Sequence, residues 1–200
     1  VPAVRRASGS LVRVEGVAPA CQETVTGSGF VYADHRVMTN AHVVAGVPRP
    51  RVRVMGTGIA YDARIVLLDR ETDVAVLDVP DLTARALTFG GAAAAGDPAV
   101  VAGFPGGGKL VAAPARVRGQ ITARGRDIDG RAGVLREVYA VRGQVRPGNS
   151  GGPLLAPDGS VLGVVFAASV DDPDTGYALT AAQVADAAAS GRSATSAVDP

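Results

Sequence analysis

The sequence predicts an all-β protein with two lobes and one helix near its C-terminus. Twelve short runs rich in apolar and β-branched residues recur along the chain, in two series of six. Turn-forming residues separate them, since the 200 residues include 26 glycines and 13 prolines. Frequent short strands with glycine- and proline-rich turns are typical of sandwiches and barrels.

Each series of runs predicts one lobe. The first lobe is expected over residues 8–82, with strands at Leu11–Val14, Gly29–Tyr32, Arg36–Thr39, Arg51–Val54, Ala63–Leu68 and Val74–Val79. The second is expected over residues 99–180, with strands at Ala99–Gly103, Ala115–Thr122, Val134–Val141, Pro153–Ala156, Val161–Ala168 and Gly176–Leu179. The small residues of segment 83–98 between them indicate a connector.

The one predicted helix covers residues 180–190. Thr180 is a suitable N-cap, strong helix formers follow it, and Gly191 marks the expected end. Residues 192–200 are then expected to form a frayed tail. The whole chain, residues 1–200, is interpreted as a single domain.

Composition argues against several classes of function. The 47% hydrophobic content supplies a core and argues against disorder, and a net charge of +1 creates no general attraction to nucleic acid or membranes. No apolar run is long enough to span a bilayer. We therefore expect a soluble piece of protein, its targeting segment lost before Val1, with no nucleic-acid partner and no membrane contact of its own.

Two local features leave alternatives open. Residues 116–146 contain eight arginines against three acidic residues, with Tyr139 as the only aromatic. A solvated basic face is the simplest interpretation, whereas binding to nucleic acid or to an anionic envelope rests on composition alone. Cys21 is the only cysteine. It is either a buried free thiol or half of a disulfide whose partner lies outside this chain.

The segment RPGNSGGPLL, residues 146–155, places Ser150 among glycines and raises the question of a nucleophile. A nucleophilic serine needs a base, and the chain has two histidines, His35 in an expected turn and His42 after a strand. Because no histidine follows Ser150, the α/β-hydrolase arrangement is excluded. A subtilisin-like order of Asp34, His42 and Ser150 would require many more helices than this chain predicts.

The acid that would orient the base is harder to choose from the residues alone. Asp69, Glu71, Asp73 and Asp78 surround one predicted strand, and Asp73 directly precedes its apolar run. The order His42, Asp73, Ser150 is that of the double-barrel serine proteases.

Three segments together resemble the signature blocks of chymotrypsin-fold serine proteases, most closely the bacterial HtrA/DegP-like branch. They are TNAHVV around His42, TDVAVL around Asp73 and PGNSGGPL around Ser150, and the resemblance extends over residues 8–190. It implies two six-stranded antiparallel β-barrels with a C-terminal helix. It also implies an extracytoplasmic endopeptidase of the cell envelope, membrane-tethered in its full-length form, that acts on proteins or peptides without cofactor or metal.

The resemblance also assigns roles to residues. His42 would act as the base, Asp73 as the group that orients it and Ser150 as the nucleophile. The backbone N–H groups of Gly148 and Ser150 would form the oxyanion hole. Asn149 stands where digestive members carry an aspartate that pairs with a new N-terminus, so activation by that route is not expected. Most HtrA-like proteins carry a peptide-binding PDZ domain after the protease, and we expect none within this chain.

The specificity pocket is expected between two segments. Gln144 and Val145 would form its floor, and the strand Phe166, Ala167, Ala168 and Ser169 would form its wall and pair with the substrate backbone. Neither floor residue is acidic, which argues against a preference for Arg or Lys and favours a small or medium apolar residue. The alternative function is a pseudoprotease or peptide-binding module that uses the same groove.

Overall fold

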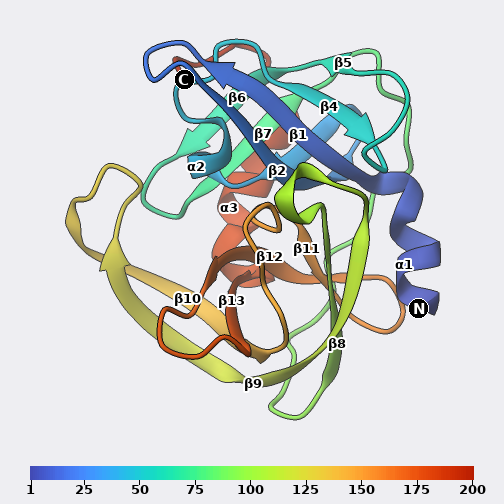
Figure 1. Ribbon diagram of the computed structural model, residues 1–200, viewed down its shortest axis with the longest axis vertical. Helices are drawn as coiled ribbons and strands as arrows, with labels where there is room; N and C mark the ends of the chain where they lie inside the picture. The colour runs from blue at the N-terminus through green and yellow to red at the C-terminus, as the bar shows by residue number, and fades with distance from the viewer.

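The computed structural model describes residues 1–200 as two β lobes joined along one junction (Figure 1). Every ladder between named strands is antiparallel. Helix α3 lies behind the junction in Figure 1 and contacts strands of both lobes. The predicted all-β architecture with a C-terminal helix is confirmed.

The first lobe is a seven-stranded sheet in the order β5-β4-β1-β2-β3-β7-β6. Its strands are β1 (Leu11–Ala18), β2 (Glu23–Ala33), β3 (Arg36–Thr39), β4 (Arg51–Val54), β5 (Tyr61–Asp62), β6 (Arg64–Asp69) and β7 (Val74–Asp78). The resemblance implied a six-stranded barrel here. The edge strands β5 and β6 are separated only by Ala63, so one bent chain segment supplies both edges and accounts for the seventh strand.

The second lobe is a closed barrel in the order β10-β13-β12-β11-β8-β9. Its six strands are β8 (Pro98–Gly103), β9 (Val111–Arg126), β10 (Ala132–Arg142), β11 (Pro153–Leu155), β12 (Val161–Ala168) and β13 (Thr175–Thr180). Strands β9 and β10 are longer than predicted because their pairing continues to Ala132 opposite Arg126. Figure 1 shows this hairpin extending beyond the barrel toward the first lobe.

The largest hydrophobic cluster lies between the lobes rather than inside either one. It contains 21 buried residues, among them Phe30 and Met38 from the first lobe, Phe104 and Leu179 from the second, and Val184 of α3. The clusters inside the first and second lobes contain 13 and 9 buried residues. Because close packing resists sliding, this shared core fixes the relative position of the two halves.

The connector and the terminal helix also join the lobes. The Leu87 N–H donates to Val31 O, and Phe89 forms a parallel bridge with Val161. Helix α3 (Ala181–Ser193) begins after Thr180, whose hydroxyl accepts from the Gln183 N–H at 3.1 Å, so the predicted N-cap is confirmed.

The helix continues two residues past the predicted stop at Gly191. Gly191 lies against β7, where a Cβ would approach Val76 Cγ2 to 2.5 Å. The absence of a side chain therefore serves close packing rather than helix termination. The tail is not frayed throughout, because Arg36 donates to Ala194 O and the Val198 N–H donates to Ile65 O.

Several short helices were not predicted from the sequence. They are α1 (Pro2–Ala7), η1 (Ser8–Ser10), α2 (Ala41–Val44) and η2 (Pro105–Gly107).

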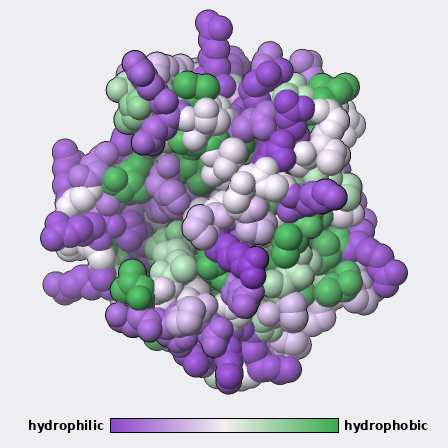
Figure 2. Space-filling model, viewed as in Figure 1, coloured by the Kyte–Doolittle hydropathy of each residue, from purple (hydrophilic) through white to green (hydrophobic).

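Cys21 is exposed at the turn between β1 and β2, so the interpretation of a buried thiol is wrong. No helix combines the length and apolar character needed to cross a bilayer. The face in Figure 2 is largely hydrophilic, with small hydrophobic areas between polar ones.

Candidate active site

Two neighbouring strands bring His42 and Asp73 together. Strands β3 and β7 are antiparallel, with Thr39 opposite Ala75, so the end of β3 and the start of β7 lie at the same edge of the sheet. His42 follows β3 in the short helix α2, and Asp73 immediately precedes β7. Asp73 adopts a left-handed backbone conformation with φ of 65°, which is uncommon for a residue other than glycine.

The carboxylate of Asp73 contacts His42 through both of its oxygens. His42 Nδ1 lies 2.6 Å from Oδ2, and the His42 backbone N–H donates to Oδ1 at 2.9 Å. The amide of Asn40 donates to Asp73 O at 2.8 Å and holds the backbone of the same residue. With an ionised carboxylate at Nδ1, the ring carries its proton there and leaves Nε2 as an acceptor.

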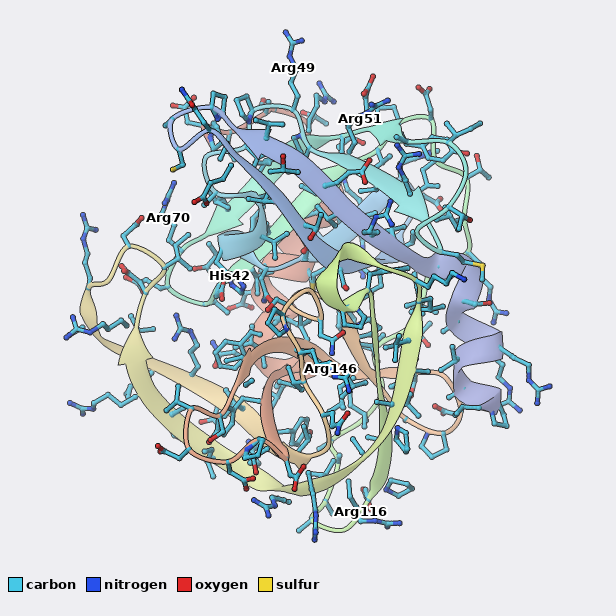
Figure 3. The ribbon with its side chains drawn as sticks, viewed as in Figure 1. His42, Arg49, Arg51, Arg70, Arg116 and Arg146 are labelled. Atoms are coloured by element: carbon cyan, nitrogen blue, oxygen red, sulfur yellow. The ribbon has the colours of Figure 1, made fainter.

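Ser150 lies across the lobe junction from this pair. Ser150, His42 and Gly148 line one open cavity of about 490 Å³, together with Thr24–Thr26 of β2 and Gly106. Figure 3 shows His42 at the boundary between the lobes and Arg146 in the loop that leads to Ser150. The three residues that the sequence singled out are therefore brought to one place.

The other candidate residues are engaged elsewhere. His35 Nδ1 contacts Leu82 O at 2.8 Å. Asp69 accepts from two N–H groups of its own turn, and Asp78 accepts from Arg36 and Arg64 at 2.6 Å each. Asp34 is exposed in the turn between β2 and β3. None of these groups lines the cavity that contains His42 and Ser150.

The backbone around Ser150 presents free donors to the cavity. The N–H groups of Gly148 and Ser150 donate to no protein acceptor, whereas the neighbouring N–H groups of Asn149 and Gly151 do. Gly148 has a φ of 99°, and a Cβ there would come within 2.5 Å of Phe104 O. Glycine is required at this turn for both reasons.

The expected specificity residues fall into two groups. Phe166, Ala167, Ala168 and Ser169 line a separate cavity of about 380 Å³, whose wall includes neither Gln144 nor Val145. Strand β11 pairs with β12 only as far as Val164, so the segment after Val165 keeps one backbone edge unpaired. This edge is available to an extended peptide.

Gln144 and Val145 differ in their surroundings. Gln144 is exposed, and its Oε1 accepts from Arg146 at 2.9 Å. Val145 packs against β13, where a Cβ on Gly176 would come within 2.3 Å of Val145 Cγ2. Asn149 is buried, and its Oδ1 has no hydrogen-bond partner.

One functional candidate was missed in the arginine-rich segment. Arg136 is 7% exposed, so the prediction of a solvated face is wrong for this residue. It donates to Glu71 O and Arg126 O at 2.8 and 3.0 Å, and its guanidinium lies 5.7 Å from the centre of the Phe166 ring. The available signal was its position on β10: Arg136 lies two residues before Val138, so both side chains point to the same, buried face of the strand.

Arg136 therefore connects the turn before Asp73 to the strand that the sequence assigned to substrate binding. A second contact also holds the β9–β10 hairpin against this turn. Arg70, in the turn, forms an ion pair with Asp129 at the tip of the hairpin (Figure 3).

Comparison with known proteins identifies the family. The model of the trypsin-like peptidase domain matches residues 27–164 and so includes His42, Asp73 and Ser150. The chain belongs to the trypsin-like peptidases. It is 46% identical over 186 residues to the serine protease Rv3671c of Mycobacterium tuberculosis, covering 92% of this chain and 46% of that protein. This confirms the narrower resemblance that the sequence motifs also indicate, to the protease domain of the mycobacterial serine protease MarP.

The chain thus spans about half the length of this curated relative. A probable periplasmic serine endoprotease, DegP-like, of Chlamydia muridarum is 35% identical over 153 residues, covering 73% of this chain and 29% of that protein. Over its protease region the chain is thus also similar to a DegP-like peptidase.

Two solved structures of the mycobacterial relative sharpen the comparison. The active form of the Rv3671c protease superposes with a TM-score of 0.95 at 44% identity, over 98% of this chain and 86% of that one. The inactive form gives a TM-score of 0.84 at 42% identity, over 94% of this chain and 91% of that one. The backbone described here is therefore closer to the active form.

Proposed function

We propose that this trypsin-like peptidase chain is the catalytic part of a serine endopeptidase that cuts proteins or peptides. His42 removes the proton from Ser150 Oγ as that oxygen attacks the peptide carbonyl, and later gives it to the departing amine. Asp73 holds the imidazole in the required tautomer and stabilises its transient positive charge. The observation that carries this proposal is the contact of both Asp73 oxygens with His42, which lines the same cavity as Ser150.

The free N–H groups of Gly148 and Ser150 support an oxyanion hole. As the carbonyl carbon becomes tetrahedral, its oxygen gains negative charge, and two fixed donors stabilise it. A single donor of this kind contributes roughly a hundredfold or more in rate. The acyl-enzyme formed on Ser150 is then hydrolysed by water, which His42 deprotonates in its turn.

The preferred residue at the cleaved position is small or medium and apolar. Val145 packs on Gly176 and reduces the space at the predicted pocket floor, and neither predicted floor residue, Gln144 or Val145, is acidic. The unpaired edge of β12 after Val165 supports binding of the substrate backbone as an added strand.

The site of action that fits the relatives is the cell envelope. A DegP-like relative is described as periplasmic, and we assign the same extracytoplasmic location to this protein, tethered to the membrane through parts of the full-length protein outside this chain. Its partners would be protein or peptide substrates.

The direct test compares cleavage of casein and of a peptide library by the wild-type chain and by Ser150→Ala. We expect cleavage by the wild type, labelling by a fluorophosphonate probe, and loss of both in the variant. Binding of peptides without cleavage or labelling would instead identify a pseudoprotease. A cleavage profile with mainly Arg or Lys at the cut position would contradict the proposed specificity.

A further inference from the structure

Ser28 occupies a central place between the two lobes. It lies on β2 between Gly27 and Gly29 and is fully buried. All its polar groups are engaged. Its N–H donates to Ser150 O at 2.9 Å, and its carbonyl accepts from Thr39 Oγ1 at 2.7 Å. Its hydroxyl donates to Gly148 O at 2.6 Å and accepts from the Phe104 N–H at 2.9 Å.

These contacts complete a regular pattern in the loop that contains the nucleophile. Four successive carbonyls, of residues 147–150, are each held by a donor. Pro147 O accepts from the Gly106 N–H at 2.7 Å, and Asn149 O accepts from the Gly152 N–H at 3.0 Å. Ser28 holds the other two carbonyls, and it is the only one of the donors that belongs to the first lobe.

Fixing the carbonyls also fixes the N–H groups. In a trans peptide the carbonyl and the N–H point in opposite directions, so each held carbonyl sets the direction of the N–H that follows it. The Pro147 and Asn149 carbonyls set the N–H groups of Gly148 and Ser150, which have no protein acceptor and belong to residues that line the cavity shared with His42. The Gly148 carbonyl sets the N–H of Asn149, in the peptide between them.

We propose that Ser28 is a positioning residue for the oxyanion hole: its hydroxyl anchors the Gly148–Asn149 peptide, which joins the two peptides that carry the Gly148 and Ser150 N–H groups, and so keeps both groups directed at the cavity. The inference rests on the proposed peptidase function. Gly148 needs such an anchor because glycine rotates more freely than any other residue. The Ser28 hydroxyl is the only side-chain group among the donors to these four carbonyls, so it can be removed by substitution.

Ser28→Ala leaves the Gly148 carbonyl without its donor and the Phe104 N–H without its acceptor. The Gly148–Asn149 peptide is then held only by the Asn149 N–H, which donates to Arg146 O, so it turns more easily. The donor peptides on either side of it then lose their fixed geometry in part of the population. We expect kcat on a peptide substrate to fall by about tenfold to a hundredfold. This decrease is no larger than the one caused by removing a direct oxyanion-hole donor. KM should change by less than about threefold, because the oxyanion forms only after the substrate is bound.

A second measurement separates positioning from general stability. The affinity of a peptidyl trifluoromethyl ketone, which forms a tetrahedral adduct, should fall by the same factor as kcat. Ser10→Ala is the matched control. Ser10 is 2% exposed and also donates from its hydroxyl to a backbone carbonyl, that of Arg85, away from the cavity. We expect this control to leave kcat and the ketone affinity unchanged.

The possible outcomes are distinct. Unchanged kcat and ketone affinity in a folded Ser28→Ala, with cleavage by the wild type and none by Ser150→Ala, would overturn the role of Ser28 and leave the peptidase intact. No cleavage by the wild type would overturn the proposed function itself. If Ser28→Ala does not fold, Ser28→Cys retains a weaker donor at the same place. In Ser28→Cys, kcat and the ketone affinity should fall by the same factor. If neither changes, the proposal is overturned.

Discussion

Asp73 contacts His42 with both carboxylate oxygens, one on the ring nitrogen Nδ1 and one on the backbone N–H. The contact is possible because β3 and β7 are neighbours, so the residues that follow one strand and precede the other lie together. The backbone contact fixes the position of the residue, and the ring contact fixes its orientation. A substitution that keeps the first contact and alters the second therefore tests the role of the ring.

Asp73→Asn provides this substitution. The amide oxygen can still accept from the His42 N–H, but an amide NH₂ facing Nδ1 forces the ring proton onto Nε2. His42 can then no longer accept the proton of Ser150, and we expect kcat to fall by about a thousandfold to ten-thousandfold. Initial-rate kinetics measure this, with circular dichroism as the check on folding.

Asp69→Asn is the matched control, because Asp69 only accepts hydrogen bonds within its own turn. It should retain nearly full activity. Equal rates for Asp73→Asn and the wild type would contradict the assignment of Asp73.

Val145→Gly should change the cleavage specificity. Val145 lies against Gly176, and its removal opens space at the predicted pocket floor. We expect the preference at the cleaved position to move from small or medium apolar residues toward Leu and Phe, by about tenfold in relative kcat/KM, since one or two methylene groups are worth this much. A peptide library profiled by mass spectrometry measures the shift.

Gln144→Ala serves as the comparison for Val145→Gly, because the Gln144 side chain is exposed and contacts Arg146. Its profile should match that of the wild type. An unchanged profile for Val145→Gly would show that Val145 does not limit the pocket.

The sequence predicted best those features that depend on neighbouring residues. The strands Arg36–Thr39, Arg51–Val54 and Val161–Ala168 have the predicted boundaries, because turn residues flank each of them. The outer parts of β9 and β10 were missed. They are held by backbone pairing, and their side chains are mostly exposed, so no apolar alternation marks them.

The candidate site was predicted only in part for a related reason. His42, Asp73 and Ser150 lie in motifs that a family resemblance can detect. Ser28 contacts residues 76 and 120 positions away, and no local pattern predicts such pairings. Arg136 belongs to a run of charges, which is ordinarily a solvated surface.

Tyr32 should make stability depend on pH in the alkaline range. Burial raises the pKa of Tyr32 to about 12 from its ordinary value near 10, and nearby Arg192 and Arg36 reduce that rise only in part. The hydroxyl donates to Ala188 O at 2.9 Å and thereby attaches α3 to the first lobe. Because the folded state holds this proton more tightly than the unfolded state, the contribution is complete below pH 10 and is lost as the pH rises through 12.

Absorbance at 295 nm, followed from pH 9 to 12.5, should contain a late tyrosine step that Tyr32→Phe removes. The loss of thermal stability between pH 10 and 12 should be smaller in Tyr32→Phe than in the wild type. Identical titration curves for the two proteins would show that Tyr32 is not the group concerned.

Arg136→Met tests the docking of the β9–β10 hairpin on the turn before Asp73. The substitution keeps much of the side-chain volume but removes the donors to Glu71 O and Arg126 O. Since leaving buried carbonyls unpaired is costly, we expect the free energy of unfolding to fall by about 2–4 kcal/mol. The turn that carries Asp73 should also become more mobile, which lowers kcat through the position of His42. Urea unfolding and amide hydrogen exchange of residues 70–73 measure both effects.

Arg124→Met, at an exposed arginine of the same hairpin, is the control and should change neither the free energy of unfolding nor the exchange of residues 70–73. If the two variants give the same values, the hairpin does not support the site.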